Sequence, residues 1–417
     1  MQPSMRAALV GVDFGKGDFA SGVEELSLLA KSAGAEPITT ILCRRASPDA
    51  ALFVGSGKAE EIKESIADLE LDLVIFNHAL SPAQQRNLER ALETRVIDRT
   101  SLILDIFAQR AKSHEGKVQV ELAQLQHLAT RLIRGWTHLE RQKGGIGLRG
   151  PGETQLETDR RLLGERVKAL RAKLNKLTRQ RATQRRSRGR SQTFSVSLVG
   201  YTNAGKSTLF NNLTKAGVFA ADQLFATLDT TSRRIYLGEA GNMVLSDTVG
   251  FIRELPHQLV AAFRATLEET IHADLLLHVV DAASPVRMDQ IEQVNLVLKE
   301  IGADHIPQIM VWNKIDASGQ EPGVERDEYD KIRRVFISAQ SGAGIDLLRG
   351  ALSEFALSDF ATPHASTEWS DAKVDADISH QDGIAADDDF SVDTGDLSDP
   401  DDDAEPAHAK FPRIAGN

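Results

Sequence analysis

The segment Gly200-Tyr201-Thr202-Asn203-Ala204-Gly205-Lys206-Ser207 constrains this chain most, because it fits the pattern GxxxxGK[ST]. The apolar run Ser195–Val199 before it predicts a strand, and Thr208–Thr214 after it can continue as a helix. The glycines allow backbone N–H groups to face a phosphate, Lys206 supplies a positive charge, and Ser207 offers a hydroxyl to Mg²⁺. All eight residues are therefore expected to bind the phosphates of a nucleotide.

A second motif, Asp247-Thr248-Val249-Gly250, follows the strand-like run Met243–Leu245. An acidic residue at a strand end can hold Mg²⁺ through water, and Gly250 can offer its N–H to a γ-phosphate. DxxG alone is common in surface turns. It is specific here because it lies about 40 residues after the phosphate-loop lysine, at the end of a strand. We therefore expect these four residues to face the γ-phosphate.

The base-binding motif is expected at Asn313-Lys314-Ile315-Asp316, after the strand-like run Gln308–Trp312. Asp316 can accept two hydrogen bonds from guanine N1–H and N2–H₂, a donor pair that adenine lacks. Asn313 can contact the purine edge and brace the phosphate loop, and Lys314 can lie along the face of the base. The contact to guanine O6 is expected from three residues after the last strand: Ser338, Ala339 and Gln340.

The segment Phe225-Ala226-Thr227-Leu228-Asp229 is expected to be a switch loop. Thr227 would complete the coordination of Mg²⁺ only while the γ-phosphate is present, although Thr230 and Thr231 are neighbouring alternatives. Ser207 and Thr227 are thus the candidate metal ligands. Catalytic roles are expected for Lys206, Thr227 and Gly250. The motifs together predict an enzyme that binds and hydrolyses GTP with Mg²⁺.

Two positions depart from the commonest small GTPases. Phe251 stands directly after DTVG, where a water-orienting glutamine is often found, and an apolar side chain cannot polarise water. We therefore expect slow intrinsic hydrolysis that depends on some other group, such as one supplied by a partner. Asn203 has two open interpretations: its side chain coordinates a monovalent cation such as K⁺, or it only caps the phosphate loop.

Residues 1–112 alternate apolar runs with helical patterns, which predicts a small α/β domain with a parallel sheet. Strands are expected at Ala7–Val12, Pro37–Cys43 and Leu73–Phe76, and helices at Gly22–Lys31, Lys58–Leu69 and Ala83–Leu92. The same alternation resumes in residues 193–360. There each strand leaves a functional loop at its end, and ligands of such sheets bind beyond the carboxyl ends of the strands.

Residues 113–192 have helical spacing instead. One helix is marked by Val118, Leu122, Leu125 and Leu132, and a second by a heptad-like series of Leu156, Leu163, Val167, Leu170, Leu174 and Leu177. We expect an antiparallel helical hairpin. Its glycine-rich loop would be Gly144–Gly152, and Arg179–Gln192 would form a linker to the next domain.

Charge is distributed unevenly along a chain whose net charge is −11. Residues 361–417 hold 15 acidic and 3 basic residues, whereas Arg131–Arg190 holds 18 basic and 5 acidic residues. The acidic segment has too few apolar residues to offset the entropy of ordering, so a disordered tail is expected. The basic block is either an electrostatic footprint for RNA phosphates or a solvated face of the helical hairpin.

The composition also indicates the cellular compartment in which the protein is expected. The only cysteine, Cys43, excludes an internal disulfide and favours a reducing environment. No run approaches the roughly 18 apolar residues of a membrane span, and no secretory pattern occurs at Met1–Val10. We expect a cytoplasmic monomer with no DNA partner and no stable membrane anchor, with weak membrane association as an alternative.

These motifs resemble the HflX family of ribosome-associated GTPases. The resemblance is carried by Gly144–Arg160, which reads GGIGLRGPGETQLETDR, and by Gly200–Thr208 together with Phe225–Asp229. It covers about residues 5–360. The family commonly has a proline after the switch aspartate, where Thr230 stands here, and this difference can alter the stiffness of the loop.

The resemblance implies an N-terminal α/β domain at 1–112, a basic helical hairpin at 113–192 and a Ras-like P-loop G domain at 193–360, with the acidic tail 361–417 outside it. It also implies that the GTP form binds the large (50S) ribosomal subunit and its rRNA, and dissociates stalled or stressed ribosomes. An alternative hypothesis is an RNA-binding module in which the nucleotide is mainly structural. That module would bind RNA equally with GTP and GDP.

Overall fold

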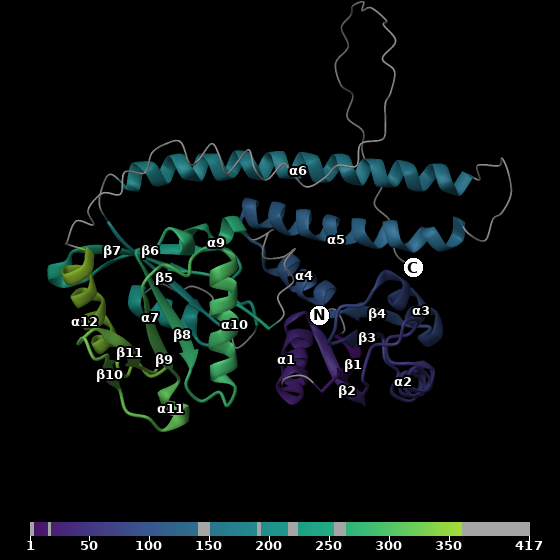
Figure 1. The fold of residues 1–417 in the computed structure, drawn as a ribbon, viewed down its shortest axis with the longest axis horizontal. Coiled ribbons are helices and arrows are strands. Elements are labelled where there is room, and N and C mark those ends of the chain that lie inside the picture. Colours follow the sequence, from purple (N-terminus) through teal and green to yellow (C-terminus); the bar gives the residue numbers. More distant parts are fainter. Residues whose placement is uncertain are drawn as a thin grey trace, which may run out of the picture. The chain divides into compact units, whose positions relative to one another are not determined.

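A computed structural model describes residues 4–15, 18–140, 151–189, 193–215, 224–253 and 264–360 (Figure 1). These residues belong to one compact unit, which extends to Thr362. The expected acidic tail and most of the expected glycine-rich loop lie outside the described residues. The class is mixed α/β with parallel sheets, as the alternating patterns predicted. The division of the chain at residues 112, 192 and 360 stays a prediction.

The first sheet has the order β2-β1-β3-β4, and all its neighbouring strands are parallel. Its strands are β1 (Met5–Asp13), β2 (Ala35–Arg44), β3 (Leu73–Phe76) and β4 (Arg95–Asp98). The helices around it are α1 (Phe19–Ser32), α2 (Ser56–Leu69), α3 (Pro82–Leu92) and α4 (Arg99–Arg110). The three expected strands and three expected helices are present, and β4 and α4 are additional.

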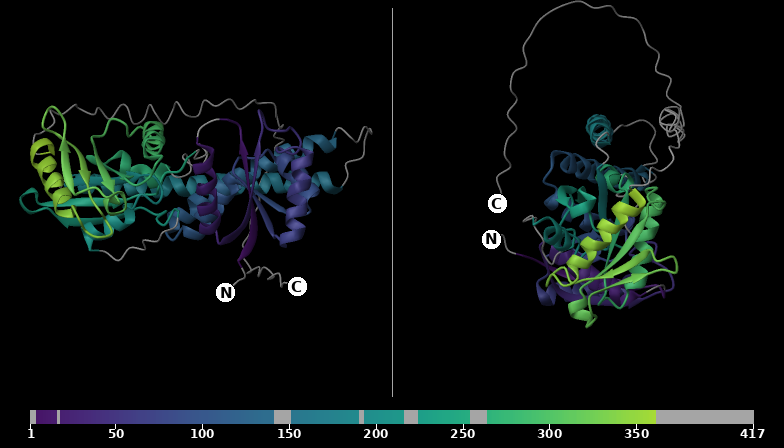
Figure 2. Two further views of the ribbon diagram at one scale, coloured as in Figure 1. Left: turned by 90° about the horizontal axis from the view of Figure 1, so that it is seen from below. Right: turned by 90° about the vertical axis from the view of Figure 1, so that its left-hand side faces the viewer.

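Strand β1 shows why this segment folds as it does. Successive side chains of a strand point to opposite faces, so Ala7 and Leu9 pack in one core with α1 and α4. Ala8 and Val10 pack in a second core with α2 and α3. Figure 2 shows helices on both faces of this sheet. A strand buried on both faces must be apolar throughout, which explains its uninterrupted apolar run.

Polar side chains fix where the helices begin. The Ser81 hydroxyl accepts a hydrogen bond from the Gln84 N–H (3.2 Å), and the Gln84 side chain accepts one from the Ser81 N–H (3.0 Å). This reciprocal pair, followed by a proline at the first helical position, starts α3. Asp98 caps α4, because its side chain accepts a hydrogen bond from the Ser101 N–H (2.9 Å), and it also accepts one from Arg131 (2.7 Å). Asp98 thus links this sheet to the long helix that contains Arg131.

Helices α5 (His114–Glu140) and α6 (Pro151–Gly189) lie side by side (Figure 1). Their contact is built from buried Val118, Leu122 and Leu170, with partly buried Leu125, Val167 and Leu174 around them. This confirms the apolar seam that the heptad-like spacing predicted. The expected linker at Arg179–Gln192 is wrong, because α6 continues to Gly189. The segment lacks proline and is rich in Arg and Gln, which favour helix.

The second sheet has the order β10-β11-β9-β8-β5-β7-β6. Its strands are β5 (Phe194–Gly200), β6 (Thr231–Tyr236), β7 (Asn242–Asp247), β8 (Leu275–Asp281), β9 (Gln308–Asn313), β10 (Gly323–Arg326) and β11 (Ile332–Phe336). The helices are α7 (Lys206–Thr214), α9 (Arg264–Ile271), α10 (Arg287–Glu300), α11 (Ile315–Ser318) and α12 (Ile345–Phe355), with short turns η1 (Gly238–Ala240) and η2 (Ala356–Phe360).

The five inner strands of this sheet are parallel, and the edge strands β6 and β10 are antiparallel to their neighbours. Parallel strands bring their carboxyl ends to one edge. That edge therefore gathers the loops after β5, β7, β9 and β11, in which the sequence motifs lie.

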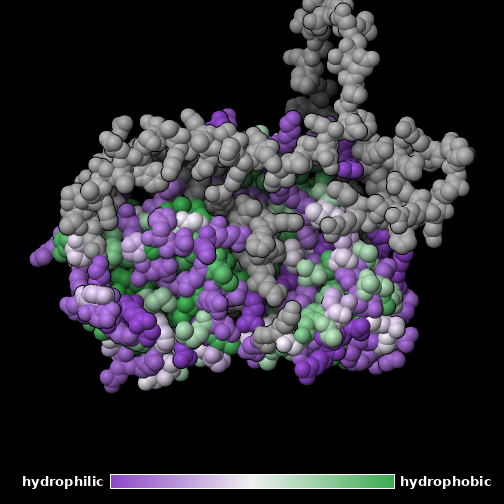
Figure 3. All heavy atoms as spheres, viewed as in Figure 1, coloured by the Kyte–Doolittle hydropathy of each residue, from purple (hydrophilic) through white to green (hydrophobic). Residues whose placement is uncertain are grey.

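The surface is mixed in polarity. On the face drawn in Figure 3, hydrophobic residues lie scattered among hydrophilic ones. Met288 and Leu296 of α10 are examples of exposed apolar side chains. Among the residues that the structure describes, no helix has both the length and the apolar character needed to cross a membrane.

Candidate active site

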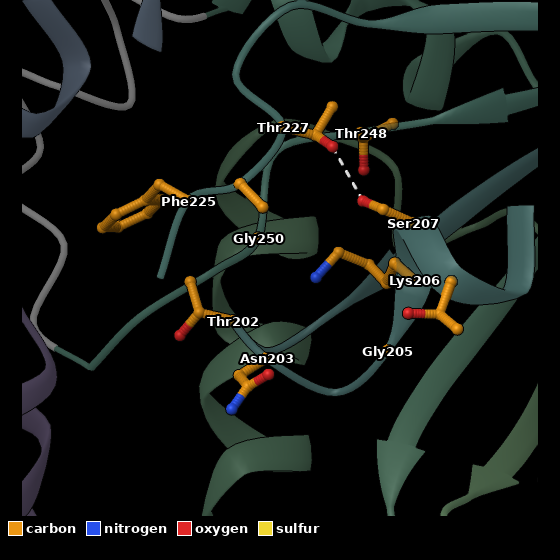
Figure 4. Close-up of a pocket in the computed structure, with 11 residues that line it drawn as sticks. Thr202, Asn203, Gly205, Lys206, Ser207, Phe225, Thr227, Thr248 and Gly250 are labelled. Atoms are coloured by element: carbon orange, nitrogen blue, oxygen red, sulfur yellow. Dashed lines mark hydrogen bonds between the residues drawn. The ribbon is translucent and has the colours of Figure 1, made fainter. Parts of the chain in front are cut away.

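A cleft opens where β5 and β7 end (Figure 4). It brings together side chains from the phosphate loop, the switch loop and the DTVG motif. The residues that line it are Thr202, Asn203, Gly205, Lys206, Ser207, Thr208, Phe225, Ala226, Thr227, Thr248 and Gly250. All except Thr208 were candidates from the sequence. Thr208 directly follows the eight-residue motif and was expected to belong to the helix after it.

The phosphate loop needs glycine at both of its ends. Gly200 and Gly205 have φ values of +147° and +94°, which side chains rarely tolerate. A Cβ at Gly200 would also meet the carbonyl oxygen of Val279, and one at Gly205 would meet the amide of Asn313. The loop is therefore packed closely between β8 and the end of β9.

Lys206 is held inside this loop. Its ammonium group donates to the carbonyl oxygens of Gly200 (3.0 Å) and Tyr201 (2.7 Å), and the side chain is buried. Burial lowers the pKa of Lys206 to about 8, and the negative charge of Asp247 opposes that shift. Phosphate oxygens at this point would favour the charged ammonium form.

Three oxygen groups meet at the start of α7. The Ser207 hydroxyl lies 2.7 Å from the Thr227 hydroxyl (Figure 4), and both lie near Asp247 Oδ2, at 2.7 and 3.0 Å. These three contacts share only two hydroxyl protons. Asp247 Oδ1 is buried without a hydrogen-bond partner among the described residues. Burial raises the pKa of the Asp247 carboxyl, and hydrogen bonds from Ser207 and Thr227 oppose the shift.

This arrangement fits a divalent cation. Hydroxyl and carboxylate oxygens are the ligands that Mg²⁺ prefers, and a cation would satisfy both the crowded oxygens and the unpartnered Oδ1. Of the three candidate switch threonines, Thr227 is the one whose hydroxyl lies at Ser207 and Asp247. Thr231 instead begins β6.

Gly250 lies against the phosphate loop. A Cβ there would stand 2.8 Å from Thr202 Cγ2 and 3.0 Å from Lys206 Nζ, so a side chain does not fit. The next residue, Phe251, pairs its backbone with the loop: its N–H donates to the Gly200 carbonyl (3.1 Å), and its carbonyl accepts from the Thr202 N–H (2.7 Å). The Phe251 ring is buried in the core rather than at the cleft.

Asn313 joins the phosphate loop to the loop after β11. Its Nδ2 donates to the Ala204 carbonyl (2.8 Å), and its Oδ1 accepts from the Ala339 N–H (2.8 Å). The side chain is only 2% exposed, so water does not replace either bond easily. A single buried amide thus sets the distance between the phosphate-binding and base-binding loops.

The rest of the base-binding segment divides into buried and exposed residues. Ile315, Ser338 and Ala339 are buried, whereas Asp316 and Gln340 are exposed. Lys314 has a left-handed backbone (φ +65°), and its ammonium group lies 2.8 Å from Asp281 Oδ2. The exposed Asp316 carboxylate in the first turn of α11 leaves its oxygens accessible to a ligand.

Several candidates use their side chains for contacts with the rest of the fold, including Thr248 at the cleft wall. Leu228 and Val249 are buried in the core, and the Thr248 hydroxyl donates to the Leu198 carbonyl (2.6 Å). The Tyr201 hydroxyl donates to Glu25 of α1 and accepts from the Arg253 N–H (2.7 Å). Burial raises the pKa of Tyr201, and the Glu25 charge raises it further.

Sequence reasoning missed the residues around that tyrosine. Arg99 donates hydrogen bonds to the Glu25 carboxylate, to the backbone carbonyl of Arg253 (3.0 Å) and to the side-chain Oδ1 of Asn77 (3.0 Å). Asp229 also turns away from the cleft, toward the start of α5. The contacts of Arg99 with Arg253, of Asp229 with Lys112 and of Tyr201 with Glu25 join residues more than 100 positions apart, and no local sequence signal could have found them.

Comparisons with known proteins agree with this geometry. Three family models match in order: GTP-binding GTPase N-terminal over residues 20–108, GTP-binding GTPase Middle Region over 110–188, and 50S ribosome-binding GTPase over 195–314. The GTPase HflX of Escherichia coli (strain K12) is 59% identical over 350 residues, which are 84% of this chain and 82% of that protein. The chain belongs to the HflX family of GTPases.

A second HflX, from Magnetococcus marinus, is 51% identical over 79% of this chain and 76% of its own length. A solved structure of a GTP-binding protein from Sulfolobus solfataricus in complex with GDP shares 25% identity, with a TM-score of 0.45, and covers 85% of this chain and 99% of that one. The HflX resemblance of the sequence motifs is confirmed. This HflX-family chain is a GTPase that binds and hydrolyses GTP.

Proposed function

We propose that this HflX-family GTPase is a switch that binds the large ribosomal subunit and its rRNA in the GTP form and dissociates stalled or stressed ribosomes. The observation that carries the switch is the contact of Thr227 with Ser207 (Figure 4) and with Asp247. A loop residue at the metal position can respond to the γ-phosphate. The matching family model, described as a 50S ribosome-binding GTPase, supports the choice of partner.

The chemistry follows from positions in the cleft. Lys206 and the loop N–H groups would hold the β- and γ-phosphates, and the Gly250 N–H would face the γ-phosphate. Ser207 and Thr227 would hold Mg²⁺ directly and Asp247 through water. Bound Mg²⁺ would neutralise charge that develops on the phosphate oxygens. When the γ-phosphate leaves, Thr227 and Gly250 lose their ligand and the two switch segments relax.

Guanine selection is assigned to the loop after β9. Asp316 would accept from guanine N1–H and N2–H₂, and Lys314 would cover the base. The segment Ser338–Gln340 would supply the O6 contact. An adenine base would leave the Asp316 carboxylate without donors, and that loss makes the site selective.

Hydrolysis in the free protein should be slow. Phe251 lies in the core, so neither its chemistry nor its position allows it to orient a water molecule. Asn203 lines the cleft with an exposed side chain, and its amide makes no hydrogen bond with the loop within the described structure. This favours K⁺ coordination over the capping role. A K⁺ ion there would add positive charge beside the phosphates.

The paired helices offer a surface for rRNA. On the described part of α6 outside the Arg166–Glu121 pair, the exposed cations are Arg160, Arg161, Lys168, Arg171, Lys173, Lys176 and Arg179. Exposed cations along one long helix suit the phosphates of RNA. We also propose that the protein acts as a cytoplasmic monomer, in keeping with its single free thiol, Cys43.

Co-sedimentation with purified large subunits tests the proposal. Wild type and Lys206→Ala would be compared in a non-hydrolysable GTP analogue and in GDP. We expect wild type to pellet with the subunits only in the GTP analogue, and Lys206→Ala to bind nucleotide weakly and stay in the supernatant. Equal pelleting in both nucleotides would support the passive RNA-binding alternative. A Lys206→Ala variant with unchanged nucleotide affinity would contradict the site assignment.

A further inference from the structure

The switch loop is held by residues outside the second sheet. The Leu224 N–H donates to the Ser32 hydroxyl at the end of α1 (3.0 Å). The Phe225 ring packs edge-on against Phe107 of α4, with ring centroids 4.7 Å apart. Asp229 reaches the start of α5. Three separate helices of the first half of the chain thus contact a segment of six residues.

The Asp229 contact is the strongest of these. Its Oδ2 accepts hydrogen bonds from the N–H groups of Lys112 and Ser113, both at 2.8 Å, and its Oδ1 accepts from the Ser113 hydroxyl at 2.5 Å. Ser113 itself caps α5, because its hydroxyl accepts from the Gly116 N–H (2.8 Å). A carboxylate at a helix start receives charge-assisted hydrogen bonds and the favourable end of the helix dipole.

Gly116 shows how closely the two segments approach. It lies in the first turn of α5, and a Cβ built on it would meet the Asp229 carboxylate and stand 3.0 Å from the Ser113 hydroxyl. Glycine weakens a helix relative to alanine. The lower helix stability is explained here by space, because any larger residue at position 116 would push Asp229 away from the start of α5.

The backbone of the switch loop is strained at its beginning. Phe225 has φ +56°, a left-handed conformation that is uncommon for a bulky residue. Such a conformation persists only where the surroundings hold it. The contacts at Ser32, Phe107 and Lys112–Ser113 supply that hold on both sides of Thr227.

We propose that Asp229 is a positioning residue for GTP hydrolysis. It docks on the start of α5 and so keeps Thr227 beside Ser207 and Asp247. Asp229 follows Thr227 by two positions, so their Cα atoms can lie at most about 7 Å apart. Thr227 therefore cannot stay at the metal position if Asp229 moves far from the start of α5. The idea rests on the proposed role of Thr227 as a ligand of Mg²⁺.

Two variants break this contact in different ways. Asp229→Ala removes the carboxylate, whereas Gly116→Ala keeps it and displaces it. Both should lower kcat by about tenfold and raise the Mg²⁺ concentration for half-maximal rate, since hydrogen bonds to a charged group are lost. GDP affinity should stay unchanged, because Thr227 acts with the γ-phosphate. Asp229→Asn retains one acceptor and should show an intermediate kcat.

Gly57→Ala is the matched control. Gly57 is exposed, lies in the first turn of α2, and has open space where a Cβ would stand. It should behave as wild type in every assay. Circular dichroism and thermal melting would show that each variant is folded. Gly116→Ala keeps the proposal testable if Asp229→Ala does not fold.

The decisive comparison is a double-mutant cycle. If Asp229 acts through Thr227, then Asp229→Ala should change kcat by less than about twofold in a Thr227→Ala background. Multiplicative effects of the two changes would overturn the proposal, as would a folded Asp229→Ala variant with wild-type kcat and Mg²⁺ dependence. If Thr227→Ala itself changed neither quantity, the metal-ligand assignment would fail and this inference with it. If only Thr227→Ala had an effect, this inference alone would fail.

Discussion

Replacing Asn313 with alanine would remove both hydrogen bonds that join the phosphate loop to the loop after β11. The change leaves two buried groups without partners, the Ala204 carbonyl and the Ala339 N–H. Each unsatisfied group costs about 1–3 kcal/mol, so together they would cost roughly 2–6 kcal/mol. Part of this cost should appear as lost stability, and part as misplacement of the two loops that hold the nucleotide.

We therefore expect Asn313→Ala to weaken GDP binding by at least about tenfold, which is 1.4 kcal/mol of the total. Asn313→Asp should be as damaging, because it keeps the acceptor for Ala339 and places an oxygen against the Ala204 carbonyl. Fluorescent-GDP titration measures the affinity, and denaturant unfolding measures the stability. Asn295→Ala, an exposed residue of α10, is the control. Wild-type GDP affinity in a folded Asn313→Ala variant would refute the bracing role.

Three further outcomes are expected. Gly250→Ala should weaken binding of a GTP analogue by about tenfold in the same titration, because the new Cβ, 2.8 Å from Thr202 Cγ2, would move the Gly250 N–H away from the γ-phosphate. GDP lacks that phosphate, so GDP binding should stay close to wild type. Phe251→Gln should lower the free energy of unfolding by roughly 2–4 kcal/mol without faster GTP turnover, because the amide would be buried; faster turnover would contradict this placement. Burial lowers the pKa of His278 to about 4. The unfolded chain therefore binds more protons between that value and about 6.5, so unfolding free energy should fall by about 2 kcal/mol from pH 7 to pH 5, and less in His278→Gln.

The nucleotide cleft could be anticipated because its residues lie in short contiguous motifs. Each motif begins where a parallel strand ends, and parallel strands place their ends at one edge of the sheet. The inner strands can be recognised in the sequence as apolar runs, because both of their faces are buried. The edge strand Thr231–Tyr236 carries two adjacent arginines and has one buried residue, so its pattern gave no strand prediction.

The support around the cleft could not be anticipated. Asp229 and Ser113 are 116 residues apart, and Tyr201 and Glu25 are 176 apart. A carboxylate that caps a distant helix has the same local sequence as one that faces solvent. Phe251 could be identified as unable to orient water, but its place in the core depends on how α4 and α5 pack near the switch segments.

The proposed switch requires that GTP hydrolysis respond to the ribosome. The most direct test is the steady-state rate of GTP hydrolysis with and without purified large ribosomal subunits. We expect a slow rate alone and an increase of at least about tenfold with the subunits, since a partner can supply the missing charge or orienting group. A rate that large subunits leave unchanged would contradict the ribosome-directed switch.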